Sequence, residues 1–431
     1  MHMIRLTTLA PGHFHAALVH KTMPAGVASR VFVYGPIDAE LLSHLQRLHS
    51  YNSRSDQPTN WEIDVRASSD WLTRFRREAP GTVAILAGRN RTKLALMHEA
   101  VTHNMHVLAD KPWILELNDL PKVEDLLYQA TLREVQVGDM MTERYEITSQ
   151  IQRELLHDAE IFGEMQKGTA TEPAVFMESV HYLKKQVSGQ PLRRPDWFFD
   201  IHTQGEGLTD VGTHLVDLVM WLLFPRRTID YRHDVNVLSA SRWPTLLTRD
   251  QFEMVTGHSH WPDFLGDALR DDRLHYFCNN RVTYQLRGVH VRLDVLWDYE
   301  SEGGGDTHQA MIHGSRSRIS IRQGNAPGDH PELYISPSSA RELPQVRRAL
   351  ERRVQGWEAK WPGLRVHDLG MQFHLSIPMT LRVGHEAHFA RVIEQYLQYL
   401  WNPRSVAPWE WPNLLAKYYT TTKAVAMARE S

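Results

Sequence analysis

The chain has 431 residues, of which 42% are hydrophobic and 23% charged, and its formal net charge at pH 7 is −3. This length predicts about two or three domains, and the composition is that of a globular protein in water. The 48 Lys and Arg residues are scattered, so the sequence offers no basic field for nucleic acid or an anionic membrane surface, and no apolar run approaches the roughly 20 residues that span a bilayer.

The number of cysteines indicates the redox state of the cellular compartment in which the protein works. Cys278 is the single cysteine of the sequence, so an internal disulfide is ruled out and a reducing compartment fits. We therefore expect a cytoplasmic protein. The sequence opens with MHMIRL, in which a second Met precedes the first expected strand, so a protein whose signal peptide has been removed is the alternative to a cytoplasmic one.

Residues 1–140 alternate short β-type runs with helical patterns. The expected strands cover 4–9, 30–35, 82–88, 106–110 and 134–140, and the expected helices cover 13–21, 38–50, 92–104 and 120–133. Continuous apolar strands that alternate with helices are typical of a parallel sheet covered on both faces. We expect this α/β segment to be a dinucleotide-binding domain.

Residues 141–431 follow a different pattern. The sequence predicts a helix at 142–157, a β-rich stretch at 164–183, a helix at 208–224, a half-solvated antiparallel strand at 291–300, a hairpin at 309–324 and helices at 385–401 and 414–428. The regions 241–280 and 325–370 lack clear periodicity and read as insertions or long loops. We expect one α+β domain with an open, mainly antiparallel sheet, which binds substrate and forms the oligomer.

The stretch TLAPGHFHAAL, residues 8–18, lies where a dinucleotide loop is expected, between the first strand and the first helix. That loop normally reads G-x-G-x-x-G, but here Ala10, Gly12 and His15 occupy the three glycine places. Either the loop has changed or it no longer binds a cofactor. The main-chain N–H groups of Gly12, His13 and Phe14, at a helix N-terminus, are candidates to receive phosphate.

The carboxyl ends of two further strands carry candidate polar groups. The second strand ends in YGPID, where Asp38 is the nearest carboxylate that could hold an adenosine ribose, although it comes late for that role. The fourth expected strand runs into ADKPW, which places Lys111 at the crevice where ligands bind. Lys111 is thus a candidate donor to a substrate oxygen, and an ordinary solvated loop lysine is the alternative.

The segment GEGLTDVGTHLVDLVMWLLF, residues 205–224, predicts a helix with two stripes. Its core stripe is apolar, and Asp210, His214, Asp217 and Trp221 repeat at the same spacing about 100° around the helix. A carboxylate one turn from an imidazole suits general acid–base chemistry. The alternative is the polar face of an ordinary amphipathic helix.

Weaker candidates lie elsewhere. His181, Arg194 and Trp197 precede this helix and are candidate substrate contacts. His385, Glu386 and His388 imitate a metal cluster, but the sequence has no complete H-E-x-x-H motif there, and helix packing explains them. We expect no metal site.

Several of these motifs resemble one family. ADKPW resembles the E-K-P motif, and GEGLTDVGTHLVDLVMWL the long helix signature, of the glucose–fructose oxidoreductase / inositol dehydrogenase / rhizopine-catabolism (Gfo/Idh/MocA) oxidoreductases. VGDMMTERYEI, with Arg144, resembles the start of their second domain, and residues 301–321 and 385–397 resemble their hairpin and C-terminal helix. PGHFHAAL, ADKP and the long C-terminal part resemble a branch with its own oxidoreductase C-terminal domain.

The resemblance implies a Rossmann domain, an open-sheet domain, and hydride transfer between a nicotinamide and a carbon of a sugar, polyol or glycoside. It implies that Lys111 polarises the reacting oxygen and that His214 takes or gives the hydroxyl proton. Asp210 would orient His214 or hold a substrate hydroxyl. The implied substrate-binding residues are Lys111, Arg144, His181, Arg194, Trp197, Asp210 and His214. The implied cofactor-binding residues are Ala10, Pro11, Gly12, His13, Phe14, His15, Tyr34, Asp38, Ala87, Gly88, Asn90, Asp110 and Lys111.

The cofactor implied is NAD or NADP, with NAD favoured, and a tightly bound cofactor is one variant. The partners expected are a small carbohydrate and further copies of the chain in a homo-oligomer. One alternative is a glycosidase or lyase that oxidises its substrate transiently with a tightly held NAD. A further alternative is a non-catalytic binding protein on a Rossmann scaffold.

Overall fold

The computed structural model describes residues 3–187, 190–301, 305–324, 326 and 328–430. It divides into two compact units. The first comprises Met1–Thr142, His202–Gln204 and Gly384–Trp411, and the second comprises Glu143–Ile201, Gly205–Val383 and Pro412–Ser431. A helix from the end of the chain, α12 (His385–Trp401), therefore belongs to the first unit, which the linear division at residue 140 does not foresee.

The first unit contains a parallel sheet, whose order among the described residues is β3-β2-β1-β4-β5-β6. Its strands are β1 (Leu6–Leu9), β2 (Arg30–Gly35), β3 (Glu62–Ala67), β4 (Val83–Leu86), β5 (His106–Ala109) and β6 (Val137–Asp139). The expected parallel α/β architecture is confirmed. β1 and β4 are buried at every position, because helices cover both faces of the sheet centre.

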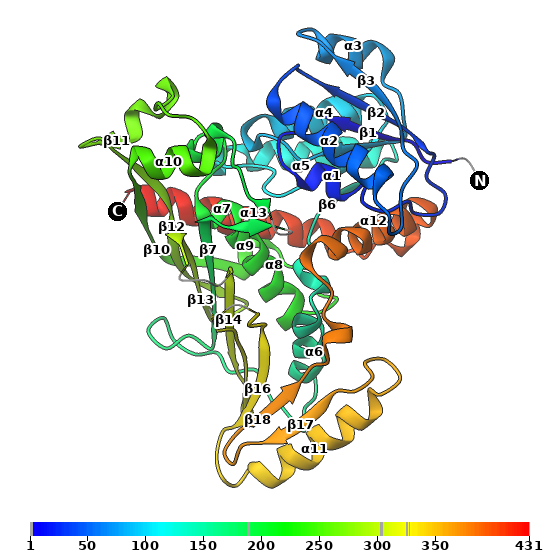
Figure 1. Ribbon diagram of the computed structural model, residues 1–431. Helices are drawn as coiled ribbons and strands as arrows, with labels where there is room; N and C mark the ends of the chain where they lie inside the picture. The colour runs from blue at the N-terminus through cyan, green and yellow to red at the C-terminus, as the bar shows by residue number, and fades with distance from the viewer. Residues whose placement is uncertain (1–2, 188–189, 302–304, 325, 327, 431) are drawn as a thin grey trace. The chain divides into compact units, whose positions relative to one another are not determined.

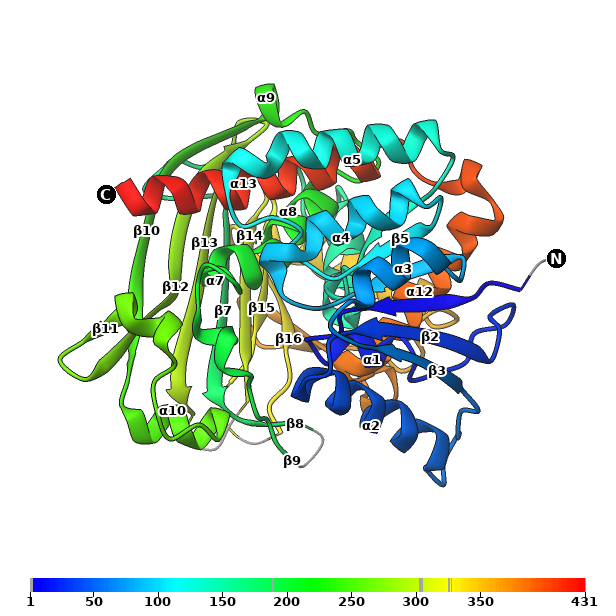
Figure 2. The same cartoon turned by 90° about the horizontal axis from the view of Figure 1, so that it is seen from above.

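The helices of this unit are α1 (His15–Leu18), α2 (Ala39–Ser53), α3 (Trp71–Glu78), α4 (Asn90–Thr102), α5 (Leu120–Leu132) and α12. In Figure 2, α1 and α2 lie on one side of the strands, whereas α3, α4 and α5 lie on the other. The first helix is shorter than the expected 13–21. β3 and α3 are absent from the sequence-based prediction, because the edge strand EIDVRA has no buried position to generate an apolar run.

The second unit is built on a mixed sheet, whose order among the described residues is β10-β12-β13-β7-β14-β15-β16-β18-β17, with β11 beside β12. The strands are β7 (Val175–Lys184), β10 (Val235–Leu247), β11 (Leu269–Arg270), β12 (Arg273–Leu286), β13 (Val289–Glu300), β14 (Thr307–His313), β15 (Ser317–Arg322), β16 (Glu332–Pro337), β17 (Arg365–Asp368) and β18 (Phe373–Ser376). β13 and β7 pair in parallel, and the other neighbouring strands among the described residues pair antiparallel, which confirms the mainly antiparallel sheet. A short pair, β8 (Gln186–Val187) and β9 (Gln190–Pro191), lies outside it.

Helices cover one face of this sheet (Figure 1). They are α6 (Ile147–Leu156), α7 (Gly207–Asp210), α8 (Gly212–Leu223), α9 (Tyr231–Asp234), α10 (Arg249–Thr256), α11 (Leu343–Gly356) and α13 (Glu410–Glu430). Along β13 the residues Val291, Leu293 and Val295 are fully buried, as the predicted alternation requires. The predicted hairpin is also present, with β14 and β15 antiparallel on either side of Gly314.

The two regions expected to be insertions or long loops contain regular strands and helices of this unit. Residues 241–280 supply most of β10, α10 and the first half of β12, and 325–370 supply β16, α11 and β17. β12 escapes the period-2 pattern because it buries two amides: Asn279 donates to the Trp243 carbonyl, and Asn280 contacts Glu206. Polar side chains that are buried with hydrogen-bond partners interrupt the alternation of apolar and polar residues by which a strand is predicted from sequence.

The expected helix at 208–224 is broken at Val211 into α7 and α8. Gly207 allows α7 to approach β12 closely, since a Cβ there would lie 1.9 Å from the Cys278 carbonyl oxygen of β12. Among the described residues, no helix is both long and apolar enough to cross a membrane.

Candidate functional site

The loop after β1 departs from a glycine-rich loop in its hydrogen bonds. Ala10, at the first glycine place, has φ +43°, a conformation that favours glycine. The N–H groups of Gly12 and His13 donate to the Ala87 carbonyl at 3.0 and 2.9 Å. These two donors are therefore engaged with the loop after β4. Phe14 takes the N-cap position of α1.

The loop after β4 lies against the loop after β1. A Cβ on Gly88 would lie 2.3 Å from the Ala10 carbonyl oxygen, so no larger residue fits there without a shift of the main chain. Together with the hydrogen bonds to Ala87, this close approach fixes the two loops at the carboxyl ends of neighbouring strands. That edge of a parallel sheet is where ligands of open α/β proteins bind.

A cavity of about 570 Å³ opens at this edge. Five of the predicted cofactor residues line it, namely Ala10, Pro11, Gly12, Asp38 and Gly88. The cavity is also lined by residues that were not predicted to bind the cofactor, among them Glu40, Trp71, Leu72 and Arg89. Trp71 begins α3, and because that helix was not predicted, no sequence signal pointed to the tryptophan.

Asp38 meets the cavity from the N-cap of α2. Its carboxylate accepts a hydrogen bond from the Leu41 N–H at 2.8 Å, which holds the side chain at the start of the helix. Burial raises the pKa of Asp38. Glu40, on the first turn of the same helix, lies 3.5 Å from the Arg89 guanidinium. Two carboxylates and one guanidinium thus surround this end of the cavity.

Two predicted cofactor residues have other roles in this structure. Tyr34 is fully buried, and its hydroxyl donates to Glu78 at 2.6 Å, so burial and this bond raise its pKa. Asn90 is also buried: its amide donates to the Gln204 carbonyl and its oxygen accepts from Lys93. Neither residue lines the cavity.

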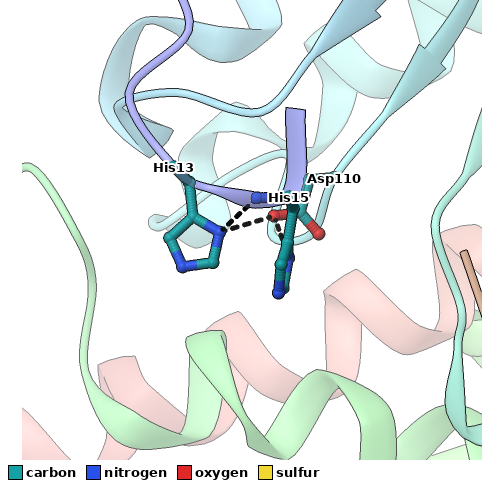
Figure 3. Close-up of side chains that lie close together, drawn as sticks. All are labelled: His13, His15 and Asp110. Atoms are coloured by element: carbon teal, nitrogen blue, oxygen red, sulfur yellow. Dashed lines mark hydrogen bonds and ion pairs between the residues drawn. The ribbon is translucent and has the colours of Figure 1, made fainter. Parts of the chain in front are cut away.

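Asp110 and Lys111 follow β5, and both are buried, with exposed fractions of 4% and 8%. Lys111 is therefore not an ordinary solvated loop lysine. Asp110 Oδ1 accepts from the Lys111 N–H at 3.0 Å, and Oδ2 lies 2.9 Å from His15 Nδ1 (Figure 3). Burial opposes ionisation of Asp110, but His15, Lys93 and Lys111 outweigh it and hold the pKa of this carboxyl far below its usual range. Burial lowers the pKa of His15, although the neighbouring Asp110 carboxylate opposes that shift.

In the second unit, Asp210 ends α7 and His214 lies in the first turn of α8, both half-buried. Asp217, one turn beyond His214, is buried, and Arg144 donates to both its oxygens at 2.6 and 2.7 Å. Lys417 lies 3.4 Å from the same carboxylate. Burial opposes ionisation, but these two cations lower the pKa of Asp217 to about 2. Arg144, a predicted substrate contact, is thus bound in an ion pair.

A cluster of charged side chains surrounds Asp306, at the start of β14. The Lys185 ammonium lies 2.5 Å and His181 Nδ1 2.9 Å from its Oδ2. The His181 ring stacks on Trp297 with ring centroids 4.9 Å apart. Burial lowers the pKa of Lys185, while the negative charges of Asp306 and Asp210 oppose that shift. Lys185 and Asp306 were not among the predicted site residues.

The other two predicted substrate contacts of this unit face its interior. Arg194 is buried and donates to the carbonyls of Leu183 and Tyr182 at 3.0 and 2.9 Å, with its guanidinium over the Phe198 ring. Trp197 is 3% exposed. Arg194 thus holds the end of β7, the strand that carries His181.

Comparisons with known proteins agree with this architecture. Residues 151–429 match the family model "Putative oxidoreductase C terminal domain". A crystal structure of a "putative oxidoreductase" from Parabacteroides merdae is 40% identical, covers 99% of this chain and 98% of its own, and superposes with a TM-score of 0.96. The chain belongs to this oxidoreductase family. No curated protein matches it.

More distant structures share the fold of this oxidoreductase. GenD2 from gentamicin A biosynthesis, in complex with NAD, is 13% identical with a TM-score of 0.58, over 100% of this chain and 95% of its own. KijD10, a 3-ketoreductase from Actinomadura kijaniata with NADP and TDP-benzene, is 14% identical with a TM-score of 0.56, over 98% and 97% of the two chains. The fold is that of the Gfo/Idh/MocA oxidoreductases.

Proposed function

We propose that this protein is an NAD(P)-dependent oxidoreductase that transfers a hydride between a nicotinamide and a hydroxyl or keto carbon of a sugar, polyol or glycoside. The cavity at the carboxyl ends of β1, β2 and β4 is the observation that carries the proposal. Membership in an oxidoreductase family supports it, and so do the cofactors NAD and NADP in the structures of GenD2 and KijD10. A homo-oligomer that acts on a small carbohydrate is part of the same proposal.

The residues around the cavity fit the adenosine end of a dinucleotide. Trp71 and Leu72 offer apolar surface for an adenine ring, and Asp38 offers a carboxylate for the ribose hydroxyls. Asp38 and Glu40 together would repel the 2′-phosphate of NADP, and Glu40 already lies beside Arg89. We therefore favour NAD. The N–H groups of Gly12 and His13 donate to Ala87, so we assign the phosphates to no specific donor.

When bound, a nicotinamide supplies or accepts the hydride of the reaction. We assign the remaining chemistry to three residues. Lys111 donates a hydrogen bond to the reacting oxygen, His214 takes or gives the hydroxyl proton, and Asp210 orients His214 or holds a second hydroxyl. An imidazole suits this proton transfer because its unperturbed pKa of about 6.5 lies near the working pH.

The first experiment identifies the cofactor. We would denature the purified protein, identify any nicotinamide released, and then follow absorbance near 340 nm with a panel of sugars, polyols and glycosides. Stoichiometric reduced cofactor supports a dehydrogenase. Release of an aglycone without added cofactor would overturn net oxidation in favour of redox-neutral cleavage, and failure to bind NAD or NADP would overturn the proposal altogether.

The second experiment tests the catalytic residues. Lys111→Ala and His214→Ala should each lower turnover by a factor of about 100 or more, because proton transfer and oxygen polarisation each contribute on that scale. Lys122→Ala is the matched control, since this exposed lysine pairs with Asp119 on the surface. Unchanged circular dichroism would show that the variants fold. Near-normal turnover in both would refute the assignment.

A further inference from the structure

Two histidines of the loop after β1 lie against the carboxylate that follows β5. His13 precedes α1, His15 is the first residue of that helix, and Asp110 follows β5, so all three belong to the first unit. Figure 3 shows both imidazole rings beside the Asp110 carboxylate. The sequence alone did not suggest this grouping, because residues 13 and 15 lie about a quarter of the chain away from Asp110.

The distances within this group are those of a metal site. One ligand atom of each residue lies within 4.8 Å of the other two. Asp110 Oδ2 is 3.7 Å from His13 Nδ1 and 2.9 Å from His15 Nδ1. Ligand bonds of about 2.0–2.2 Å at tetrahedral or octahedral angles require donor atoms about 3.0–3.5 Å apart. The two separations from Asp110 Oδ2 are each within a few tenths of an ångström of this range, and the two imidazole nitrogens lie no more than 4.8 Å apart.

The surroundings hold the ligand atoms toward one another. The Lys111 N–H occupies Asp110 Oδ1 and so leaves Oδ2 facing the imidazoles. The Lys93 ammonium donates to the main-chain carbonyls of Asp110 and Pro112 and to the Asn90 side chain. Outer contacts of this kind orient metal ligands in known sites.

The two imidazoles are also placed to coordinate as neutral ligands. His13 Nδ1 lies 3.5 Å from the His15 N–H, which favours an unprotonated Nδ1 on His13. His15 is 8% exposed and packs on Phe389 with ring centroids 4.6 Å apart, which limits how far its ring can rotate. On binding, a metal ion would replace the proton between His15 and Asp110, and the imidazole would carry its proton on Nε2.

We propose that His13, His15 and Asp110 bind a divalent first-row transition-metal ion, with Zn²⁺ or Co²⁺ as the expected class. Imidazole and carboxylate donors suit these ions better than Mg²⁺ or Ca²⁺, which prefer oxygen ligands alone. Three protein ligands leave at least one coordination position open for water or another oxygen ligand. The structure thus leads us to replace the expectation of no metal. The proposal does not depend on the proposed function.

The test uses the full chain in the absence of nucleotide. After treatment with a chelator, the protein is titrated with Co²⁺ and with Zn²⁺, and binding is followed by the visible absorption of Co²⁺ and by calorimetry, with Mg²⁺ as the comparison ion. We expect one strong site per chain for the transition metals and much weaker binding of Mg²⁺. His13→Gln and His15→Gln should each weaken binding by more than about 100-fold, since loss of an outer-shell partner already costs about 10- to 100-fold.

His49→Gln is the matched control, because His49 is exposed and lies on α2, away from the three ligands in sequence. It should bind Co²⁺ like the original chain. Because His15 is buried, its variant requires an unfolding curve to show that it folds, and the half-buried His13 provides the second test. The proposal is overturned if the folded chain binds no strong equivalent of Co²⁺, or if the His13 and His15 variants bind it as tightly as His49→Gln. Either result would leave dinucleotide binding untouched.

Discussion

The two units stabilise buried charge in different ways. In the second unit, buried carboxylates are paired with cationic side chains: Asp217 with Arg144, Asp294 with Arg281 and Arg292, and Glu206 with Arg242 and Arg429. In the first unit, Asp110 meets an imidazole and a main-chain N–H, and Lys93 binds main-chain carbonyls. Permanent ion pairs fix a scaffold at every physiological pH, whereas imidazoles can exchange a proton for another ligand.

This difference also distinguishes residues whose side chains stabilise the fold from residues whose side chains can bind a ligand or exchange a proton. The family resemblance implies that Arg144 contacts the substrate. In the structure, however, its guanidinium donates to both carboxylate oxygens of Asp217. His15 takes the third glycine place of the loop, and both His13 and His15 face a carboxylate (Figure 3). The first unit therefore keeps its exchangeable donors at the ligand-binding edge of its sheet.

The largest expected effect comes from breaking an ion pair of the second unit. Arg144→Met should lower the free energy of unfolding by about 3–5 kcal/mol, because the buried Asp217 carboxylate loses its bidentate partner while Lys417 remains 3.4 Å away. Urea denaturation of the variant and the original chain measures this difference. Adding Asp217→Asn to Arg144→Met should recover part of the loss. A loss below about 1 kcal/mol would contradict the view that this pair holds the unit together.

Local patterns predict much of the first unit and less of the second. The buried run VAIL identified β4, and the position of Lys111 just after β5 identified a residue at the ligand edge. β12 was missed because Asn279 and Asn280 interrupt its apolar face with amides whose partners are distant in sequence. The pairing of Arg144 with Asp217 spans 73 residues, and no spacing rule within one element predicts it.

A second prediction concerns the neutral imidazoles of the first unit. His20 is fully buried, and burial lowers its pKa to about 4, although its hydrogen bond to the Ala16 carbonyl opposes that shift. In the unfolded chain the pKa of His20 is about 6.5. Between about pH 6.5 and pH 4 the unfolded state therefore binds a proton at His20, whereas the folded state does not. The contribution of the neutral His20 to the free energy of unfolding is thus retained above about pH 6.5 and lost as the pH falls toward 4. From pH 7 to pH 5 the loss due to His20 should be about 2 kcal/mol.

Urea unfolding of the original chain and of His20→Gln, at pH 7 and pH 5, checks this expectation. Glutamine stays neutral and can still donate to the Ala16 carbonyl, so the pH-dependent loss should shrink by about 2 kcal/mol. A residual dependence should remain, because burial also lowers the pKa of His44. The exposed His49→Gln should leave the dependence unchanged. An equal pH dependence in all three proteins would show that buried imidazoles do not control the acid stability of this unit.

The smallest expected effect lies at the first glycine place of the loop after β1. Ala10 has φ +43°, where a Cβ costs about 1–2 kcal/mol, and glycine removes that cost while giving back about 0.5–1 kcal/mol in chain entropy. Ala10→Gly should therefore raise the free energy of unfolding by about 0.5–1 kcal/mol. Ala17→Gly, within α1 at ordinary helical φ, is the matched control and should lower it. If both substitutions destabilise the protein equally, the alanine methyl group contributes packing at this loop that outweighs the backbone strain.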